Sequence, residues 1–148
     1  MDSPDSLGPP AGVDQSELID AMVRTSFVIT AVLSKIAAEH ELSLTQLRVL
    51  AILRDRQGAM SDLATHLGLD KSTISGLVDR AEKRGLLQRT PNPSDGRGVD
   101  VALTEEGIEL AELGGAEVAQ ALLPMTSTLT LPEARRVTIL LERMLGAR

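Results

Sequence analysis

The spacing of hydrophobic and polar residues divides the middle of this chain into three helices followed by a β-hairpin. Between residues 43 and 85 apolar positions recur every three or four residues, the period of a helix with one buried side. In the third helix the buried stripe consists of Ile74, Leu77, Val78 and Ala81. Asp70 is the expected N-cap of that helix, and glycine at position 85 is expected to end it.

The period changes to two after the third helix, as expected for strands. Leu86 and Leu87 lead into a first strand, and Val99, Val101 and Leu103 alternate with polar neighbours in a second. The segment between the strands, PNPSDGRG, contains two prolines and two glycines. It therefore predicts a turn-rich tip on a small antiparallel hairpin.

The polar side of the third helix has the composition of a surface that enters the major groove of DNA. Its residues are Lys71, Ser72, Thr73, Ser75, Gly76, Asp79, Arg80 and Lys83. Small hydroxyl side chains allow close approach, and together with cations they bind phosphates and base edges. At the hairpin tip Arg97 stands between two glycines and suits a narrow minor groove. Asp95 is expected to pair with Arg97 and orient it, or to bond loop amides. The predicted DNA-binding residues are Ser61, Lys71, Ser72, Thr73, Ser75, Arg80, Lys83, Asp95 and Arg97.

This segment resembles the winged helix-turn-helix of MarR-type regulators, the multiple antibiotic resistance regulator family. The resemblance rests on LDKSTISGLVDRAEKRGLLQR, which matches a recognition helix, and on NPSDGRGVDVALTEEG, which matches a wing. It implies a mainly α fold with a small β-hairpin wing, a winged helix-turn-helix domain with N- and C-terminal dimerisation helices. It also implies an obligate homodimer that places the recognition helix in the major groove and the wing arginine in the minor groove. Glycine at positions 76, 96 and 98 departs from the polar or cationic side chains that the family often has there.

The ends of the chain predict a dimerisation region around the winged domain of residues 43–103. Residues 1–13 lack periodicity and are expected to form a disordered tail. Helices are expected over Gln15–Glu39, over Thr104–Leu123, where Thr104 is the N-cap and Pro124 helps to end the helix, and over Pro132–Leu145, with Thr130 as a possible N-cap. These helices, in residues 14–42 and 104–148, are apolar on more than one side, so they pack either on a second copy or in an intrachain bundle. The first interpretation is favoured, and its predicted dimerisation residues are Leu18, Met22, Val137, Leu140, Leu141 and Met144.

Composition narrows the class of protein. The 148 residues contain no cysteine, which excludes disulfides and sensing by direct thiol oxidation. The net charge is −6, but residues 71–97 hold six Lys or Arg and three Asp or Glu. That segment is therefore +3 and the remainder −9, so the positive charge lies where DNA is expected.

Other chemistry is not expected from the sequence. His40 and His66 stand alone, and the carboxylates at 105, 106, 109 and 112 are interpreted as a solvated helix face, so no metal, cofactor or enzymatic activity is expected. Nothing resembles a signal peptide or a membrane span, and we expect a cytoplasmic protein.

The predicted function is a homodimeric transcriptional regulator, a ligand-responsive repressor that binds a pseudo-palindromic operator. An activator would use the same fold. The alternative is a winged-helix dimer with weak or lost DNA binding that acts as a protein-interaction or ligand-binding module, motivated by the three glycines and the acidic charge. The resemblance implies a small anionic or phenolic effector between the dimer helices and the winged domain, and the candidate effector residues are Ser26, Phe27, Thr30, Gln46 and Arg48.

Overall fold

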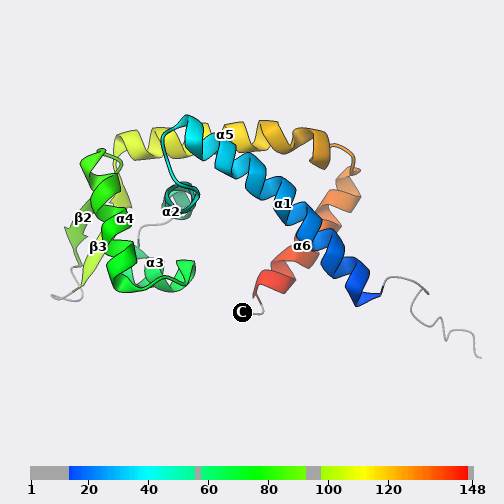
Figure 1. The fold of residues 1–148 in the computed structure, drawn as a ribbon, viewed down its shortest axis with the longest axis horizontal. Helices are drawn as coiled ribbons and strands as arrows, with labels where there is room; N and C mark the ends of the chain where they lie inside the picture. Colours follow the sequence, from blue (N-terminus) through cyan, green and yellow to red (C-terminus); the bar gives the residue numbers. More distant parts are fainter. Residues whose placement is uncertain (1–13, 56–57, 93–97, 147–148) are drawn as a thin grey trace, which may run out of the picture. The chain divides into compact units, whose positions relative to one another are not determined.

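The fold consists of six helices and a three-stranded sheet within residues 14–55, 58–92 and 98–146, which the computed structural model describes (Figure 1). The elements follow the order α1 (Gln15–Glu39), α2 (Leu44–Asp55), β1 (Gly58–Ala59), α3 (Met60–Leu67), α4 (Lys71–Lys83), β2 (Leu87–Pro91), β3 (Val99–Leu103), α5 (Glu105–Thr126) and α6 (Leu131–Gly146). The chain forms two compact units, residues 1–31 and 32–148, whose boundary falls inside α1. The tail predicted over residues 1–13 lies outside the described residues.

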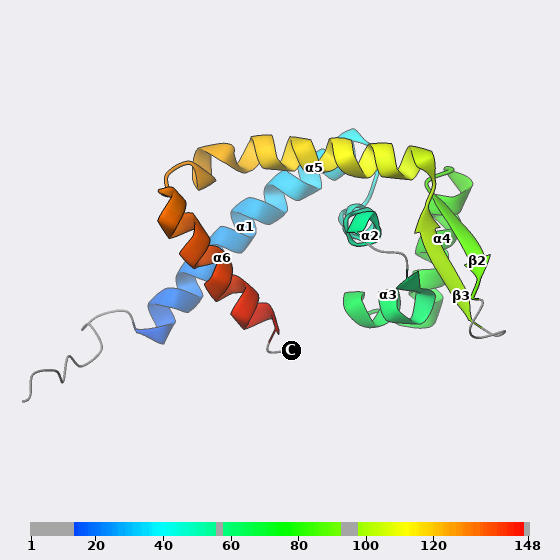
Figure 2. The same cartoon turned by 180° about the vertical axis from the view of Figure 1, so that it is seen from behind.

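The hydrophobic core of the second unit is built on helix α4. All four residues of the predicted stripe, Ile74, Leu77, Val78 and Ala81, are buried, which confirms the helical period seen in the sequence. They pack with side chains of α2, α3, β2, β3 and α5 in one aliphatic cluster. Figures 1 and 2 both show α4 beside the β2–β3 hairpin. The buried stripe therefore fixes which side of α4 remains available to a partner.

The sheet has one strand more than the sequence predicts. Strand β3 pairs antiparallel with β2, Leu87 opposite Leu103, and its other edge pairs with the two-residue strand β1, where Gly58 lies opposite Val101. The predicted alternation of β3 is also wrong in part, because Ala102 is buried and Val99 is 37% exposed. Strand β3 lies between the other two strands, and its last three residues are buried while Val99 reaches solvent.

The helix ends confirm most of the predicted caps. The Asp70 carboxylate accepts the Thr73 amide at 2.8 Å, and the Thr104 hydroxyl accepts the Gly107 amide at 3.1 Å. After α4, Gly85 adopts φ +75° and donates its amide to the Glu82 carbonyl at 2.9 Å. A left-handed residue at this point is easy only for glycine, so Gly85 turns the chain into β2.

Pro124 does not end α5 as predicted. The helix continues to Thr126, and its last turn is closed by the Ser127 amide, which donates to the Leu123 carbonyl at 2.8 Å. A proline this close to the helix end removes one hydrogen bond without interrupting the turn that follows. Helix α6 begins at Leu131, where the Thr130 hydroxyl and the Glu133 carboxylate cap each other's amides at 3.4 and 2.8 Å.

Helices α1 and α6 expose apolar side chains. The six predicted dimerisation residues are between 38% and 47% exposed in the single chain: Leu18, Met22, Val137, Leu140, Leu141 and Met144. Helix α1 is also long and apolar enough to cross a membrane by length and composition alone, a test that helices of soluble proteins pass as well. Several large apolar side chains exposed together on a helix are typical of a surface that another molecule covers.

Candidate nucleic-acid interface

The exposed side of α4 carries the polar residues predicted from the sequence. Lys71, Ser72, Thr73, Arg80 and Lys83 are exposed, and Ser75 is half-buried. Side chains three, four or seven residues apart share a helix face, and the buried stripe occupies the opposite one. The prediction that these residues face away from the core is therefore confirmed, whereas their contact with DNA is not tested by the fold.

The first turn of α4 is fixed by Asp70. Its carboxylate accepts the Thr73 amide and the Ser72 hydroxyl, each at 2.8 Å. The hydrogen bond from the Thr73 amide, followed by that from the Ser72 hydroxyl, holds the pKa of the Asp70 carboxyl below its ordinary value of 3.8. The negative charge at the start of the helix is thus engaged by the helix itself, in agreement with the role expected for Asp70.

Three cations on α4 remain available to an anionic partner. Lys71, Arg80 and Lys83 form no ion pair or side-chain hydrogen bond within the described residues. Arg80 lies against Gly76, where a β-carbon would meet its Nη1 at 3.5 Å. One cation is therefore at the start of the helix and two are near its end, spaced to contact phosphates along a groove.

A hollow of about 500 Å³ lies beside the start of α4, between the start of α3 and the wing strands. It is lined by Ala59, Met60, Ser61, Lys71, Ser75, Asn92, Gly98 and Val99. Three of the predicted DNA-binding residues, Ser61, Lys71 and Ser75, thus come together from two helices. A concave surface with hydroxyl and ammonium groups is suited to a phosphate backbone.

Arg89 is one of the six cations counted between residues 71 and 97, and the structure shows that it is engaged by carboxylates of α4. From β2, its guanidinium donates to Asp79 Oδ1 at 2.6 Å and to Glu82 Oε1 at 3.2 Å, and its backbone amide donates to Glu82 Oε2 at 3.1 Å. The hydrogen bond with Asp79 raises the pKa of Arg89 above its ordinary value. The alternation of side chains along a strand could have indicated this position of Arg89. It lies two residues after the buried Leu87, so both side chains point to the same face of the sheet.

Arg84, another of the six cations counted between residues 71 and 97, is also engaged. It follows α4 directly, and its guanidinium donates to the carbonyls of Glu41 and His40 at 2.8 and 3.0 Å. The His40 ring also contacts Glu117 of α5 at 3.0 Å. These contacts join the end of the recognition helix to the corner between α1 and α2.

Two of the predicted DNA-binding residues belong to the tip of the hairpin. Asp95 and Arg97 lie outside the described residues, so their predicted roles at the wing tip stay predictions.

Gly76 is half-buried in the middle of α4, and a β-carbon there would meet only the flexible end of Arg80. No steric requirement for glycine is present at this position.

The five candidate effector residues divide between the two units. Ser26, Phe27 and Thr30 lie on α1 in the first unit, where Phe27 is 69% exposed. In the second unit Gln46 and Ser43 cap each other's backbone amides at the start of α2, at 2.9 and 3.1 Å. Arg48 donates to the His66 carbonyl at 3.5 Å, near the end of α3. The binding role of these residues stays a prediction.

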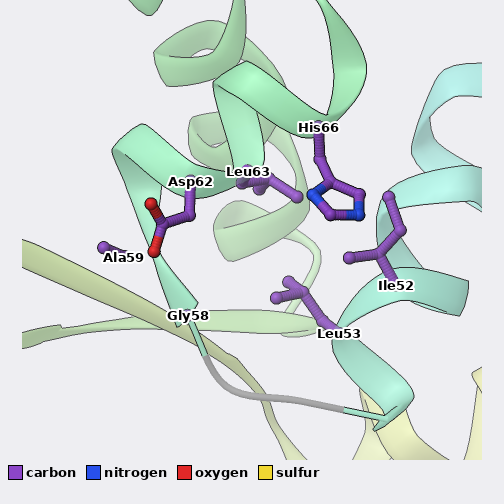
Figure 3. A pocket seen from close by; sticks show the side chains of 7 residues that line it. All are labelled: Ile52, Leu53, Gly58, Ala59, Asp62, Leu63 and His66. Atoms are coloured by element: carbon purple, nitrogen blue, oxygen red, sulfur yellow. The ribbon is translucent and has the colours of Figure 1, made fainter. Parts of the chain in front are cut away.

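A pocket between α2, β1 and α3 is too small for an organic effector. Figure 3 shows its lining, in which the ring of His66 lies close to Ile52 while Asp62 is on the far side of Leu63. Its volume is about 30 Å³, far below the roughly 300–1,000 Å³ of pockets that hold small organic ligands. His66 is thus part of a mostly apolar wall.

Comparison with known proteins identifies the family. The model of the MarR family matches residues 42–99. The chain is 32% identical over 108 residues to the multiple antibiotic resistance protein MarR of Salmonella typhimurium, covering 71% of this chain and 74% of that protein. It is 33% identical over 101 residues to the HTH-type transcriptional repressor NicR of Pseudomonas putida, covering 67% of this chain and 64% of NicR. The chain thus spans less than two thirds of the length of that curated relative.

A solved structure extends the similarity to almost the whole chain. A mutant MarR from E. coli, crystallised in complex with operator DNA, superimposes with a TM-score of 0.67 at 25% identity and covers 90% of this chain and 99% of that one. In this neighbour, a fold like the present one binds operator DNA. On the sequence match, the shared winged helix and this likeness, the chain belongs to the MarR family.

Proposed function

We propose that this chain is a homodimeric transcriptional repressor that binds a pseudo-palindromic operator. The observation that carries the proposal is the exposed side of α4, where three cations that form no ion pair with another described residue stand among small hydroxyl residues. The remaining surface is acidic, since the whole chain carries −6. An acidic body directs DNA to the recognition helix, because phosphate is repelled elsewhere.

The proposed dimer uses the exposed apolar side chains of α1 and α6. A second copy would remove the exposed parts of Leu18, Met22, Leu140 and Met144 from water, which are 38–47% of each residue. Each would then contribute roughly 0.6–1.4 kcal/mol, the same fraction of the value for a fully exposed side chain. Residues 14–42 and 104–148 would then dimerise, and residues 43–103 would read DNA. Two recognition helices held about one helical turn of DNA apart recognise two half-sites related by a twofold axis.

Repression follows from occupancy of the operator, which blocks access to the promoter. The family relationship to NicR, which is named a repressor, supports this sign of regulation.

A small anionic or phenolic effector would act by favouring a spacing of the two recognition helices that does not fit the operator. Ser26, Phe27, Thr30, Gln46 and Arg48 stay its candidate contact residues, and we propose that the protein is cytoplasmic.

The first test is binding of the purified protein to a labelled duplex of the intergenic region upstream of its gene. Affinity is measured by fluorescence anisotropy at two salt concentrations and with unrelated duplex as competitor. A repressor binds tightly, resists competitor and weakens steeply with salt. Equal affinity for both duplexes would favour the module that has lost specific DNA binding.

A further inference from the structure

The contacts of Arg89 extend the proposed function to a residue that need not touch DNA. We propose that Arg89 is a positioning residue for DNA binding, which keeps the carboxylates of Asp79 and Glu82 away from phosphate and ties β2 to the recognition helix. The role rests on the proposed function, since it concerns the same surface of α4.

The position of Asp79 makes an unpaired carboxylate there unfavourable for DNA binding. Asp79 follows Ser72 by seven residues and Ser75 by four, so it lies on the same face of α4 as two of the predicted DNA-binding residues. Its side chain is 55% exposed and that of Glu82 is 42% exposed. Two free carboxylates in each copy would repel the phosphates that the neighbouring cations attract.

Arg89 is held more firmly than a surface cation. Its side chain is 26% exposed, and the guanidinium reaches Asp79 at 2.6 Å, Glu82 at 3.2 Å and the Ser75 carbonyl at 3.4 Å. The Arg89 backbone amide adds a fourth contact, with Glu82 at 3.1 Å. A planar guanidinium can satisfy two carboxylates and a carbonyl at once, which a lysine ammonium in one position cannot reproduce.

These contacts also tie β2 to α4. Three of the four contacts run from the β2 side chain to α4, and the fourth fixes the β2 backbone itself. Opposite Arg89 in the sheet lies Val101, which is fully buried. Buried apolar side chains such as Val101 therefore hold the hairpin in the core, and the ion pairs of Arg89 with Asp79 and Glu82 hold β2 to the exposed side of α4.

The test is a double-mutant cycle on DNA affinity. The variants are Arg89→Ala, Asp79→Asn and the combination, and the probes are the upstream duplex and a random-sequence duplex at low salt. We expect Arg89→Ala to weaken binding to both duplexes by about tenfold or more, and Asp79→Asn to restore part of the loss in the Arg89→Ala background. Coupling between contacting charged residues typically amounts to about 2- to 150-fold.

Arg54→Ala is the matched control. Arg54 pairs with Asp55 at 3.1 Å, so its removal also deletes one positive charge and releases one carboxylate. Arg54 belongs to α2 and lies against Gly115 of α5, on elements other than the recognition helix. Its variant is expected to bind within about twofold of the wild type, because Arg54 lies on α2 and the interaction of a charge with phosphate through water weakens with distance.

The outcomes separate the proposal from its alternatives. Loss of affinity without recovery by Asp79→Asn would mean that Arg89 itself contacts phosphate, and an effect no larger than that of Arg54→Ala would remove its role altogether. Both results overturn the proposal while the wild type still binds DNA. If the wild-type chain binds neither duplex, the proposed function fails and this role fails with it.

Thermal unfolding shows whether each variant folds. If Arg89→Ala does not fold, Arg89→Lys, which keeps the charge, replaces it in the cycle.

Discussion

Two glycines in helices, Gly76 and Gly107, are predicted to respond to alanine in opposite directions. Alanine has the higher helix propensity, worth about 0.8–1 kcal/mol relative to glycine in a helix interior. At Gly76 this gain should be realised, since a β-carbon would meet only Arg80 Nη1 at 3.5 Å. We therefore expect Gly76→Ala to stabilise the protein by up to about 1 kcal/mol.

Gly107 lies in the first turn of α5 and is buried. A β-carbon there would overlap the Leu86 carbonyl oxygen and lie 3.0 Å from its carbon, and both atoms belong to the backbone. The same carbonyl accepts the Thr104 amide at 3.0 Å, so moving it weakens a hydrogen bond at the start of α5. Inserting one carbon into such a site typically costs about 1–3 kcal/mol, which exceeds the gain in propensity.

The assay is thermal unfolding of both variants and the wild type at one protomer concentration, because dimerisation makes the melting temperature depend on concentration. For a chain of this length 1 kcal/mol corresponds to about 2–4 °C. Gly107→Ala should melt several degrees below the wild type, and Gly76→Ala at or above it. A Gly107→Ala variant that melts as high as the wild type would refute the close approach of α5 to Leu86.

Four further variants test the caps and the proposed surfaces. Thr104→Ala removes the cap on α5 and should destabilise the protein by about 1 kcal/mol in urea unfolding; an unchanged midpoint contradicts this. The pKa of Asp70 is lower in the folded chain than its ordinary value of 3.8, so its stabilising contribution is present above that pH and is lost as the pH falls through the folded pKa. Asp70→Asn should therefore lose less stability than the wild type on acidification below pH 3.8, and parallel curves would argue against the cap. Lys71→Ala should reduce the slope of log affinity against log salt by about 0.9 for each copy that contacts phosphate, whereas an unchanged slope places Lys71 off the DNA. Leu140→Glu should yield monomers in analytical ultracentrifugation and lose operator binding; an intact dimer would move the interface elsewhere.

The parts of the fold that the sequence predicts are those governed by local rules. The stripe from Ile74 to Ala81, the cap at Asp70 and the turn at Gly85 each depend on residues within one or two helical turns, and each was predicted correctly. Strand β1 was missed because two residues, Gly58 and Ala59, are too few to show a period. It is a strand only because β3, more than 30 residues later, supplies its hydrogen-bond partners.

The candidate site divides in the same way. The exposure of Lys71, Ser72 and Arg80 follows from helical geometry, so the sequence was sufficient. The pairing of Arg89 with Asp79 was not foreseen, because counting charges treats every arginine as free. Ten residues separate the two, and they meet only through the turn that packs β2 on α4.

Because α4 has one buried and one exposed side, substitutions that alter the proposed DNA contacts need not alter the core. Ile74 and Val78 are fully buried and maintain the fold, whereas Ser72 and Thr73 are exposed beyond the cap of the helix. Exposed positions accept substitution with little effect on stability, within about 0.5 kcal/mol in most cases. On the proposed function, the scaffold can therefore acquire new operator specificity, by natural drift or in the laboratory, through replacement of surface side chains without redesign of the interior.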